Sequence, residues 1–486
     1  MTSIKLIQDG ADMNLRQQLA LTAKLSAPAI MAQLSTILMQ YIDASMVGRL
    51  GAGESASVGL MNSSLWLFWG VCSMITMGFS VQAAHRLGAK DFAGARSVLR
   101  QGLVACAVAG AVMALLGVAI AVPLPHWLGG DDAICGGASR YFIIFVAALP
   151  ILTMNYLAGG MLRSAGNMKV PGLLNVAMCV LDVVFNFFLI FSTREISLAG
   201  CTFTVPGASL GITGAALGTV LAECVIACVM MWYLVRRQPD LMLRGEEARK
   251  LYRPTRTVLA RAARIGMPMT AEHIIFCGAQ ITITVIVAPL GVVAIAANAF
   301  AVTAESLCYM PGFGIGEAAT TLCGQSYGAG RYGLVKRFCH LTTFLGMLIM
   351  SVMAVVMYIA APQMMRIMTP VDAIADLGAE VLRIEAWAEP MYAASIVAYG
   401  AFVGVGDTLL PAVMNFGSIW LVRIPLAALM APHMGLRGVW IAMCIELVFR
   451  GLIFLWRMRT GRWLKKPKEK SAVPVDPEGE GWLDNG

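Results

Sequence analysis

An acidic residue inside a long apolar stretch is the first feature of this sequence that could do chemistry. Asp43 is the one charged residue in 27–48, a segment long enough to cross a bilayer as a helix. Polar side chains precede it at three- and four-residue intervals and share one stripe of that helix: Gln33, Thr36 and Gln40. A carboxylate at membrane depth costs about 2.5–3.5 kcal/mol on insertion scales. Asp43 is therefore expected to face other helices or water, either as a satisfied structural contact or, as intramembrane acids favour, as an ion or proton site.

Two further apolar segments carry polar residues at helical spacing. Asp182 and Asn186 are four residues apart, as are Thr219 and Glu223, so each pair shares a helix face. We predict that Asp43, Asp182, Asn186 and Thr219 form one cluster. Its carboxylate, amide and hydroxyl oxygens suit a hard cation such as Na⁺, and they equally suit a shared proton.

Other residues are candidates for a substrate cavity. Glu305 lies in an apolar segment and has no partner nearby in the sequence. Methionine side chains adapt their shape to different ligands. The predicted cavity residues are Gln33, Gln40, Glu305, Met39, Met61 and Met310.

No set of residues in the sequence has the spacing of an enzyme site. The five histidines show no metal-ligand spacing, and there is no phosphate-binding glycine loop or nucleophile with a base. We therefore expect neither an enzyme nor a cofactor, apart from a coupling ion, Na⁺ or H⁺.

The composition is typical of a helical membrane protein. Of 486 residues, 58% are hydrophobic and 13% charged, and the mean hydropathy is +0.73. The net charge of +8 is better explained by the positive-inside rule than by nucleic-acid binding. We predict an all-α polytopic protein with twelve transmembrane helices, at about 25–48, 57–84, 98–122, 138–160, 171–192, 208–235, 265–288, 292–323, 338–361, 381–404, 408–431 and 435–457.

These spans divide the chain into two lobes and three polar segments. The predicted boundaries are an N-terminal segment (1–24), an N-terminal lobe (25–235), a linker (236–264), a C-terminal lobe (265–458) and a tail (459–486). With the N-terminus inside, 28 of the 36 Lys and Arg residues fall on the cytoplasmic side, six fall outside, and Arg423 and Arg450 lie within spans. From this bias we expect both termini to lie in the cytoplasm. We also expect the protein to be in the cell's inner (plasma) membrane.

The two lobes are predicted to be repeats. Three prolines recur at a constant offset of 240 residues, as the pairs Pro28/Pro268, Pro150/Pro390 and Pro171/Pro411. The offset falls to 224 after the fifth span, which places an extra loop, predicted as an outer hairpin, near 197–209. Six spans per repeat put the pseudo-two-fold axis along the membrane normal, as in transporters that rock between two states.

The second repeat lacks the acids of the first. Ile283 stands at the position of Asp43, and Val422 at that of Asp182. We therefore predict that coupling chemistry is confined to the first lobe.

Several motifs resemble the multidrug and toxic compound extrusion (MATE) family over residues ~25–460. They are the first span with its Pro28, Gln40 and Asp43, the stretch M-L-R-S-A-G-N-M-K-V-P (161–171), its counterpart V-G-V-G-D-T-L-L-P (403–411), and L-G-I-T-G-A-A-L-G-T (210–219).

The resemblance implies a MATE-like fold that exports organic, often cationic and amphipathic compounds by antiport with Na⁺ or H⁺. It implies that the family's first-lobe cation site is formed in this chain by Asp43, by either Asp182 or Asn186, and by Thr219. In the fifth span many family members have an asparagine followed four residues later by an aspartate. This chain has the reverse order, Asp182 and then Asn186. Phe276 and Tyr392 occupy places where some members have second-lobe acids.

The implied partners are small organic molecules and membrane lipid, and we expect a monomer. A flippase for lipid-linked oligosaccharides, from the same wider superfamily, is the alternative. It would need a more basic cavity than Arg423 and Arg450 supply. A receptor or scaffold would leave the buried acids and the repeat unexplained.

Overall fold

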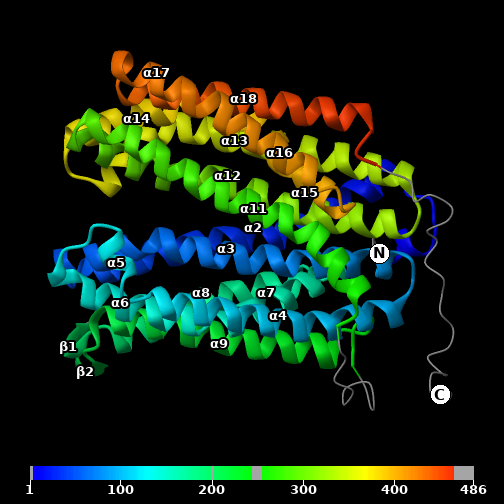
Figure 1. Ribbon diagram of the computed structural model, residues 1–486, viewed down its shortest axis with the longest axis horizontal. Coiled ribbons are helices and arrows are strands. Elements are labelled where there is room, and N and C mark those ends of the chain that lie inside the picture. Colours follow the sequence, from blue (N-terminus) through cyan, green and yellow to red (C-terminus); the bar gives the residue numbers. More distant parts are fainter. Residues whose placement is uncertain (1–3, 199–200, 244–253, 465–486) are drawn as a thin grey trace, which may run out of the picture.

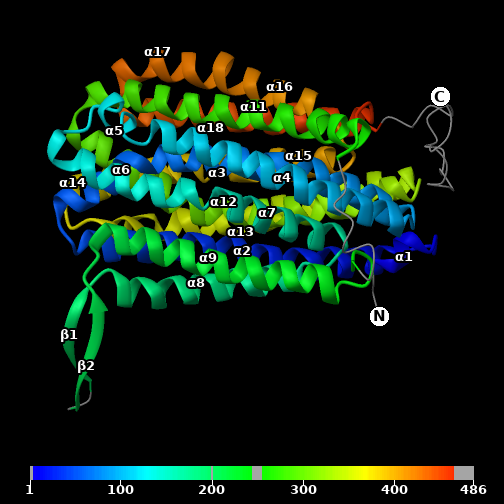
Figure 2. The same cartoon turned by 60° about the horizontal axis from the view of Figure 1, so that its bottom comes forward.

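The computed structural model describes residues 4–198, 201–243 and 254–464. Two lobes of long, roughly parallel helices lie side by side: the blue-to-green helices of the first half below, and the green-to-red helices of the second half above (Figure 1). The first and last described helices, α1 and the C-terminal part of α18, lie at one end of the bundle, here called the terminal end. A β-hairpin projects from the opposite end, here called the hairpin end (Figure 2).

The first lobe follows a short N-terminal helix, α1 (Lys5–Gln8). Its elements are α2 (Leu15–Gly48), α3 (Ala52–Gly88), α4 (Phe92–Ile120), α5 (Leu124–Trp127), α6 (Asp132–Ala147), α7 (Leu149–Ser164), α8 (Lys169–Leu189), the strands β1 (Ser192–Leu198) and β2 (Cys201–Ala208), and α9 (Gly211–Arg237).

The second lobe begins at Arg256, within the predicted linker rather than near residue 265. Its elements are α11 (Arg256–Val287), the 3₁₀ turn η1 (Ala288–Leu290), α12 (Val292–Gly328), α13 (Tyr332–Met368), α14 (Asp372–Glu385), α15 (Glu389–Gly404), α16 (Leu409–Gly417), the π-helical segment η2 (Ser418–Arg423), α17 (Ile424–Met434) and α18 (Leu436–Thr460). Part of the linker, 244–253, and the tail from residue 465 lie outside the described residues.

The predicted set of membrane spans is confirmed. Among the described residues, ten helices are long and apolar enough to cross a bilayer, and α6 with α7, bent by 45°, counts as an eleventh span if the pair is taken as one. The pair α14 and α15 stands at the equivalent place in the second repeat, and together these elements correspond to the twelve predicted spans. Many apolar side chains are exposed on the helices, such as Leu115 (72%), Val292 (81%) and Ile359 (68%). Such a surface is stable in lipid and not in water.

Helix bounds confirm the repeat. Residues 52–88 and 292–328, the limits of α3 and α12, differ by 240 at both ends, as do 149–164 and 389–404, the limits of α7 and α15. The offset between the repeats falls from 240 to 224 residues because a hairpin, with antiparallel strands β1 and β2, is inserted between α8 and α9. The predicted hairpin near 197–209 is therefore present.

Local sequence explains where the helices begin. An Asn14–Gln17 capping box opens α2, and the Asp91 side chain accepts a hydrogen bond from the Gly94 N–H at the start of α4 (2.8 Å). Gly51 and Gly291 precede α3 and α12 with φ of 128° and 98°, a region that glycine enters without a Cβ clash. These equivalent turns return the chain into the membrane in both lobes.

Candidate functional site

Three helices of the first lobe bring the predicted acidic cluster together. Asp43 comes from α2, Asp182 and Asn186 from α8, and Thr219 from α9. Asp182 and Asn186 are fully buried, and Thr219 is 7% exposed. The structure therefore places all four predicted residues in one region of the lobe.

Asn186 is the hub of this cluster. Its Nδ2 donates to Asp43 Oδ1 at 2.8 Å and to Asp182 Oδ2 at 3.1 Å. Asp182 also interacts with Asp43 and with the Thr219 hydroxyl. One neutral amide thus joins two carboxylates that approach each other closely.

The cluster keeps unused oxygen atoms. Asp182 Oδ1 and Asn186 Oδ1 have no hydrogen-bond partner among the described residues, although buried polar atoms are normally paired. Together with Asp43 they offer an oxygen set that fits a hard cation, or a carboxylate that holds a proton.

Glycines on α9 allow the close packing that this geometry needs. A Cβ on Gly218 would lie 2.1 Å from Asn186 Oδ1, and one on Gly214 would lie 2.4 Å from the carbonyl oxygen of Leu189. Because both distances are shorter than any real contact, α9 can approach α8 in this way only with glycine at these positions.

Glu223 and Tyr141 belong to the surroundings of the cluster but were not among the predicted site residues. Glu223 lies one turn beyond Thr219 on α9, interacts electrostatically with Asp182, and keeps an unpaired Oε2. Its four-residue spacing from Thr219 is a signal in the sequence that could have included it. Tyr141, from α6, interacts electrostatically with both aspartates, and no sequence spacing points to it.

A cavity of about 680 Å³ lies beside the cluster toward the hairpin end. Its volume is in the range of small-molecule sites. Residues near the ends of α2 and α8, and just beyond those ends, line it: Tyr41, Ile42, Ser45, Met46, Arg49, Phe187 and Phe191.

The predicted cavity residues lie in several different places. Gln33 bridges the lobes by donating to Glu317 Oε1 (3.3 Å), while Gln40 and Met310 are half-buried. Met39 and Met61 were expected to line a cavity. Both are instead buried in apolar clusters of the first lobe. Their helical spacing fits core packing as well as cavity lining, and the structure places them in the core.

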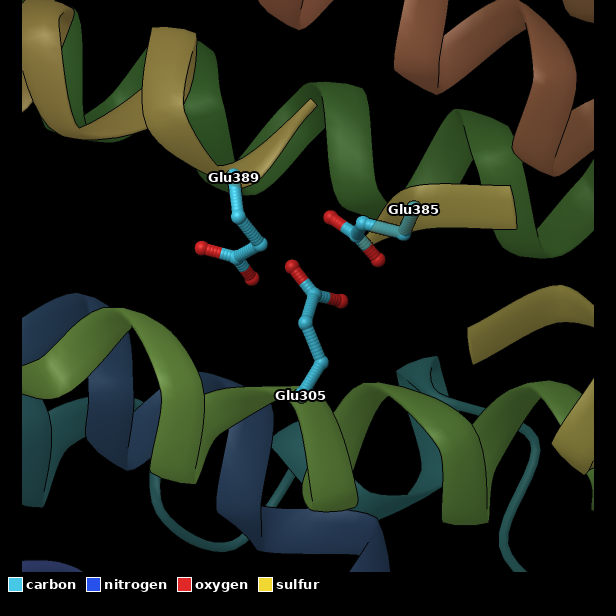
Figure 3. Close-up of side chains that lie close together, drawn as sticks. All are labelled: Glu305, Glu385 and Glu389. Carbon is cyan, nitrogen blue, oxygen red and sulfur yellow. The ribbon is translucent and has the colours of Figure 1, made fainter. Parts of the chain in front are cut away.

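The second lobe also contains buried acids, among them the predicted cavity residue Glu305. Glu305 is 6% exposed, and Glu385 and Glu389 are fully buried; they lie together (Figure 3). None of the three is at a position equivalent to Asp43 or Asp182, so comparing the repeats at those two sites could not reveal them.

Other polar groups of the second lobe are paired. Glu446 and Arg450 form an ion pair within α18 (2.8 Å), as their spacing indicates. Glu272 joins three helices by accepting hydrogen bonds from Tyr399 (2.6 Å) and Asn415 (2.5 Å).

The lobes meet closely at the terminal end. Gln325 donates to the Ser164 carbonyl (2.6 Å), and the ring of His85 bonds to the Gly404 carbonyl (2.8 Å). A Cβ on Gly88 would lie 2.1 Å from the Gln325 carbonyl oxygen, and one on Gly328 would lie 2.0 Å from that of His85. This reciprocal contact between α3 and α12 holds the two lobes together there.

A family model matches both halves of the chain. The model, MatE, covers residues 28–188 and 268–429, more than half of the chain and in the same two copies as the structural repeat. The chain belongs to the MatE family. MatE proteins are membrane transporters rather than enzymes, so the predicted family, fold and absence of enzyme activity are confirmed.

Relatives of this MatE chain match over nearly its whole length. A Thermotoga maritima protein named "Probable multidrug resistance protein NorM" is 25% identical and covers 91% of this chain and 92% of its own. A Pseudomonas aeruginosa protein of the same name is 29% identical over 94% of this chain and 93% of its own.

Solved structures share the MatE fold. A MATE transporter in the straight conformation has a TM-score of 0.83 at 21% identity, covering 92% of this chain and 97% of its own. A multidrug resistance MATE family transporter described as outward-facing has a TM-score of 0.84 at 20% identity, with 96% and 99% covered.

Proposed function

We propose that this protein is a secondary active transporter that exports organic, often cationic and amphipathic compounds in exchange for Na⁺ or H⁺. The exchanged ion binds at the cluster of Asp43, Asp182, Asn186 and Thr219. Relatives named multidrug resistance proteins support the substrate class.

One observation carries the coupling proposal: Asn186 holds Asp43 and Asp182 next to each other inside the membrane-spanning bundle. Two adjacent buried carboxylates are poorly tolerated when both are charged. A bound Na⁺ or proton relieves this repulsion, so occupation of the cluster can bias the two conformations of the transporter.

The neighbouring cavity is the proposed place for the exported compound. Tyr41 and Ile42 line it on α2, directly beside Asp43 in the chain, and Phe187 lines it on α8 beside Asn186. A substrate there and an ion at the cluster would act on the same two helices, which gives a physical route for coupling.

The orientation proposal places the terminal end in the cytoplasm of the inner membrane. The 28-to-6 bias of basic residues supports it. One positive charge that moves inward across 100 mV supplies about 2.3 kcal/mol, enough for more than a tenfold gradient of an exported neutral molecule.

The test is export by cells that express the Asp43→Asn variant. We expect these cells to retain a fluorescent organic cation as cells without the protein do, because the amide cannot bind a proton or neutralise Na⁺. The control is Asp376→Asn, at an exposed acid of α14, which should export normally. Full export by Asp43→Asn at equal expression would contradict the assignment.

Proteoliposomes identify the coupling ion. A Na⁺ gradient and a pH gradient are imposed separately, and the efflux of the same cation is followed. The active gradient should drive transport by the wild-type protein and not by Asp43→Asn. Equal transport without either gradient would exclude antiport.

A further inference from the structure

The stretch that precedes α2, residues 4–14 and here called the strap, lies at the terminal end of the bundle. It contains α1, a turn at Gly10 with φ of 73°, and Asn14, which caps α2. Figure 2 shows α1 beside the ends of the long helices. The strap continues directly into α2 of the first lobe, so any contact that it makes with the second lobe links the two lobes.

Arg331 holds the backbone of the strap on the second lobe. This residue lies in the turn between α12 and α13. Its guanidinium donates to the carbonyl oxygens of three strap residues: Leu6 at 3.1 Å, Ile7 at 3.4 Å and Ala11 at 2.8 Å. Hydrogen bonds from a charged donor are the stronger kind. One side chain thus fixes the strap at three points.

The turn itself does not require an arginine. At the 240-residue offset, the equivalent residue in the first lobe is Asp91, whose side chain caps α4 by accepting a hydrogen bond from the Gly94 N–H (2.8 Å). Arginine has no acceptor, and among the described residues α13 has no side-chain cap. In the second lobe, the capping residue is therefore replaced by one that binds the strap.

Apolar side chains of the strap are also docked on the second lobe. Ile7 is fully buried and Met13 is 5% exposed. Both belong to an apolar cluster built largely from α12, α13 and α15. Removing these side chains from water favours the docked position through the hydrophobic effect.

Gln8 joins the strap to the contact between the lobes. Its Nε2 donates to Gln325 Oε1 (3.2 Å), and Gln325 Nε2 donates to the Ser164 carbonyl of the first lobe (2.6 Å). Gln325 is fully buried. Because its amide binds the strap through one atom and the first lobe through the other, the strap orients a side chain that closes the terminal end.

The strap also touches two turns of the first lobe. Asp9 forms an ion pair with Lys90, in the turn between α3 and α4 (2.7 Å), in which both side chains are at least half exposed. Ile4 lies against Gly166, in the turn between α7 and α8, where an added Cβ would be 2.7 Å from Ile4 Cδ1. An exposed ion pair adds little stability, so the contacts with the second lobe are the stronger ones.

We propose that the strap is an autoinhibitory latch, which keeps the terminal end closed and has to leave the second lobe before that end can open. A transporter of two rocking lobes must separate them at this end during its cycle, and the strap spans them there. In the proposed orientation the terminal end faces the cytoplasm, so the strap controls the entry of the exported compound; this last step rests on the proposed function.

Distances between spin labels test the proposal in the full-length protein in lipid nanodiscs. Labels at Ala93→Cys and Arg337→Cys, exposed positions on α4 and α13, in a background without native cysteines, report whether the terminal end is closed. Arg331→Gln should raise the ratio of open to closed molecules at least about tenfold, the effect of one lost hydrogen bond to a charged group. Arg459→Gln, at an exposed arginine of α18, is the control and should leave the ratio unchanged.

A deletion separates the action of the strap from a local effect of Arg331. Removal of residues 2–13 keeps the Asn14–Gln17 cap of α2 and should also open the terminal end. Adding Arg331→Gln to this deletion should change nothing further, because the arginine acts through the strap. A label at Asp12→Cys, exposed in the strap, should give a sharper EPR line in Arg331→Gln, which shows release.

Three results would overturn the proposal. They are an unchanged distance in the deletion variant, additive effects of the deletion and Arg331→Gln, and a strap that is released while the terminal end stays closed. The measured quantity is a distance between the lobes and not export. A failure of the proposed export or ion coupling would therefore appear in the transport assays and leave these distances as expected.

Discussion

At the scale of single residues, Asn186 determines the geometry of the first-lobe cluster. Its one amide nitrogen donates to both aspartates, which orients two carboxylates that would otherwise repel each other. The order of Asp182 and Asn186 along α8 is the reverse of the usual family order, yet both residues still face Asp43. The exchange therefore keeps the cluster, because four residues along a helix return to the same face.

Replacing Asn186 with leucine should disable this arrangement. The Asn186→Leu variant keeps the bulk of the side chain but leaves the buried Asp182 and the half-buried Asp43 without their shared donor, at a cost of about 1–3 kcal/mol in the free energy of unfolding. We expect a lower melting temperature in detergent and little export. Asn62→Leu, at an exposed amide of α3, is the control. Wild-type export by Asn186→Leu would show that the bridge is dispensable.

At the scale of elements, the contact between α8 and α9 depends on glycine. Gly218 faces Asn186 so closely that α9 forms one wall of the cluster. A helix that had only to span the membrane would tolerate alanine here, and alanine has the higher helix propensity. The glycine at this position is thus explained by the site and not by the helix.

Gly218→Ala should therefore separate α8 from α9 or displace the Asn186 side chain. Overpacking of this kind costs about 1–3 kcal/mol, and transport should fall further than stability because the bridge is disturbed. The matched change is Gly417→Ala in α16, where an added Cβ meets no atom within 4 Å. Transport assays on both variants, with expression measured in parallel, check this prediction; equal transport would refute it.

The sequence predicts the elements better than it predicts the contacts between them. The spans, the repeat and the hairpin follow from hydrophobic length and from prolines at a fixed offset, which are local signals. The first-lobe cluster could be predicted because Asp43, Asp182 and Asn186 are conspicuous charges and amides in apolar segments. Its exact partners, Glu223 and Tyr141 included, depend on helix rotation, which the sequence does not specify.

The second-lobe glutamates show the limit of such reasoning. Glu305 is easily singled out, but Glu385 and Glu389 are about 80 residues away and flank a break between two helices. Helical periodicity does not extend across that break. Only the packing of α14 and α15 against α12 reveals that the three carboxylates meet.

At the scale of the whole molecule, the two lobes pack closely against each other at the terminal end. Hydrogen bonds from Gln325 and His85 to backbone carbonyls of the opposite lobe make this contact. A transporter that rocks must break these bonds to open this end. The interface between α3 and α12 is thus expected to control the balance between the two conformations.

The double variant Gly88→Ala, Gly328→Ala should shift that balance. Each added methyl group would meet a backbone carbonyl at about 2 Å, so the closed terminal end loses stability relative to the open one. Spin labels at Ala93→Cys and Gly333→Cys, in a background without native cysteines, should report a longer mean distance. Gly59→Ala, with open space around it, should leave the distance unchanged, and an unchanged distance in the double variant would contradict the prediction.

The mutual fit of Gly88 and Gly328 also bears on how a duplicated chain can evolve. Each glycine accommodates backbone from the opposite copy, so a bulkier residue acquired in one copy can be offset only by a change some 240 positions away. In their interiors, by contrast, the two copies carry buried acidic side chains on helices that are not equivalent. At the contact between α3 and α12, however, a change of residue in one copy has to be matched by a change in the other.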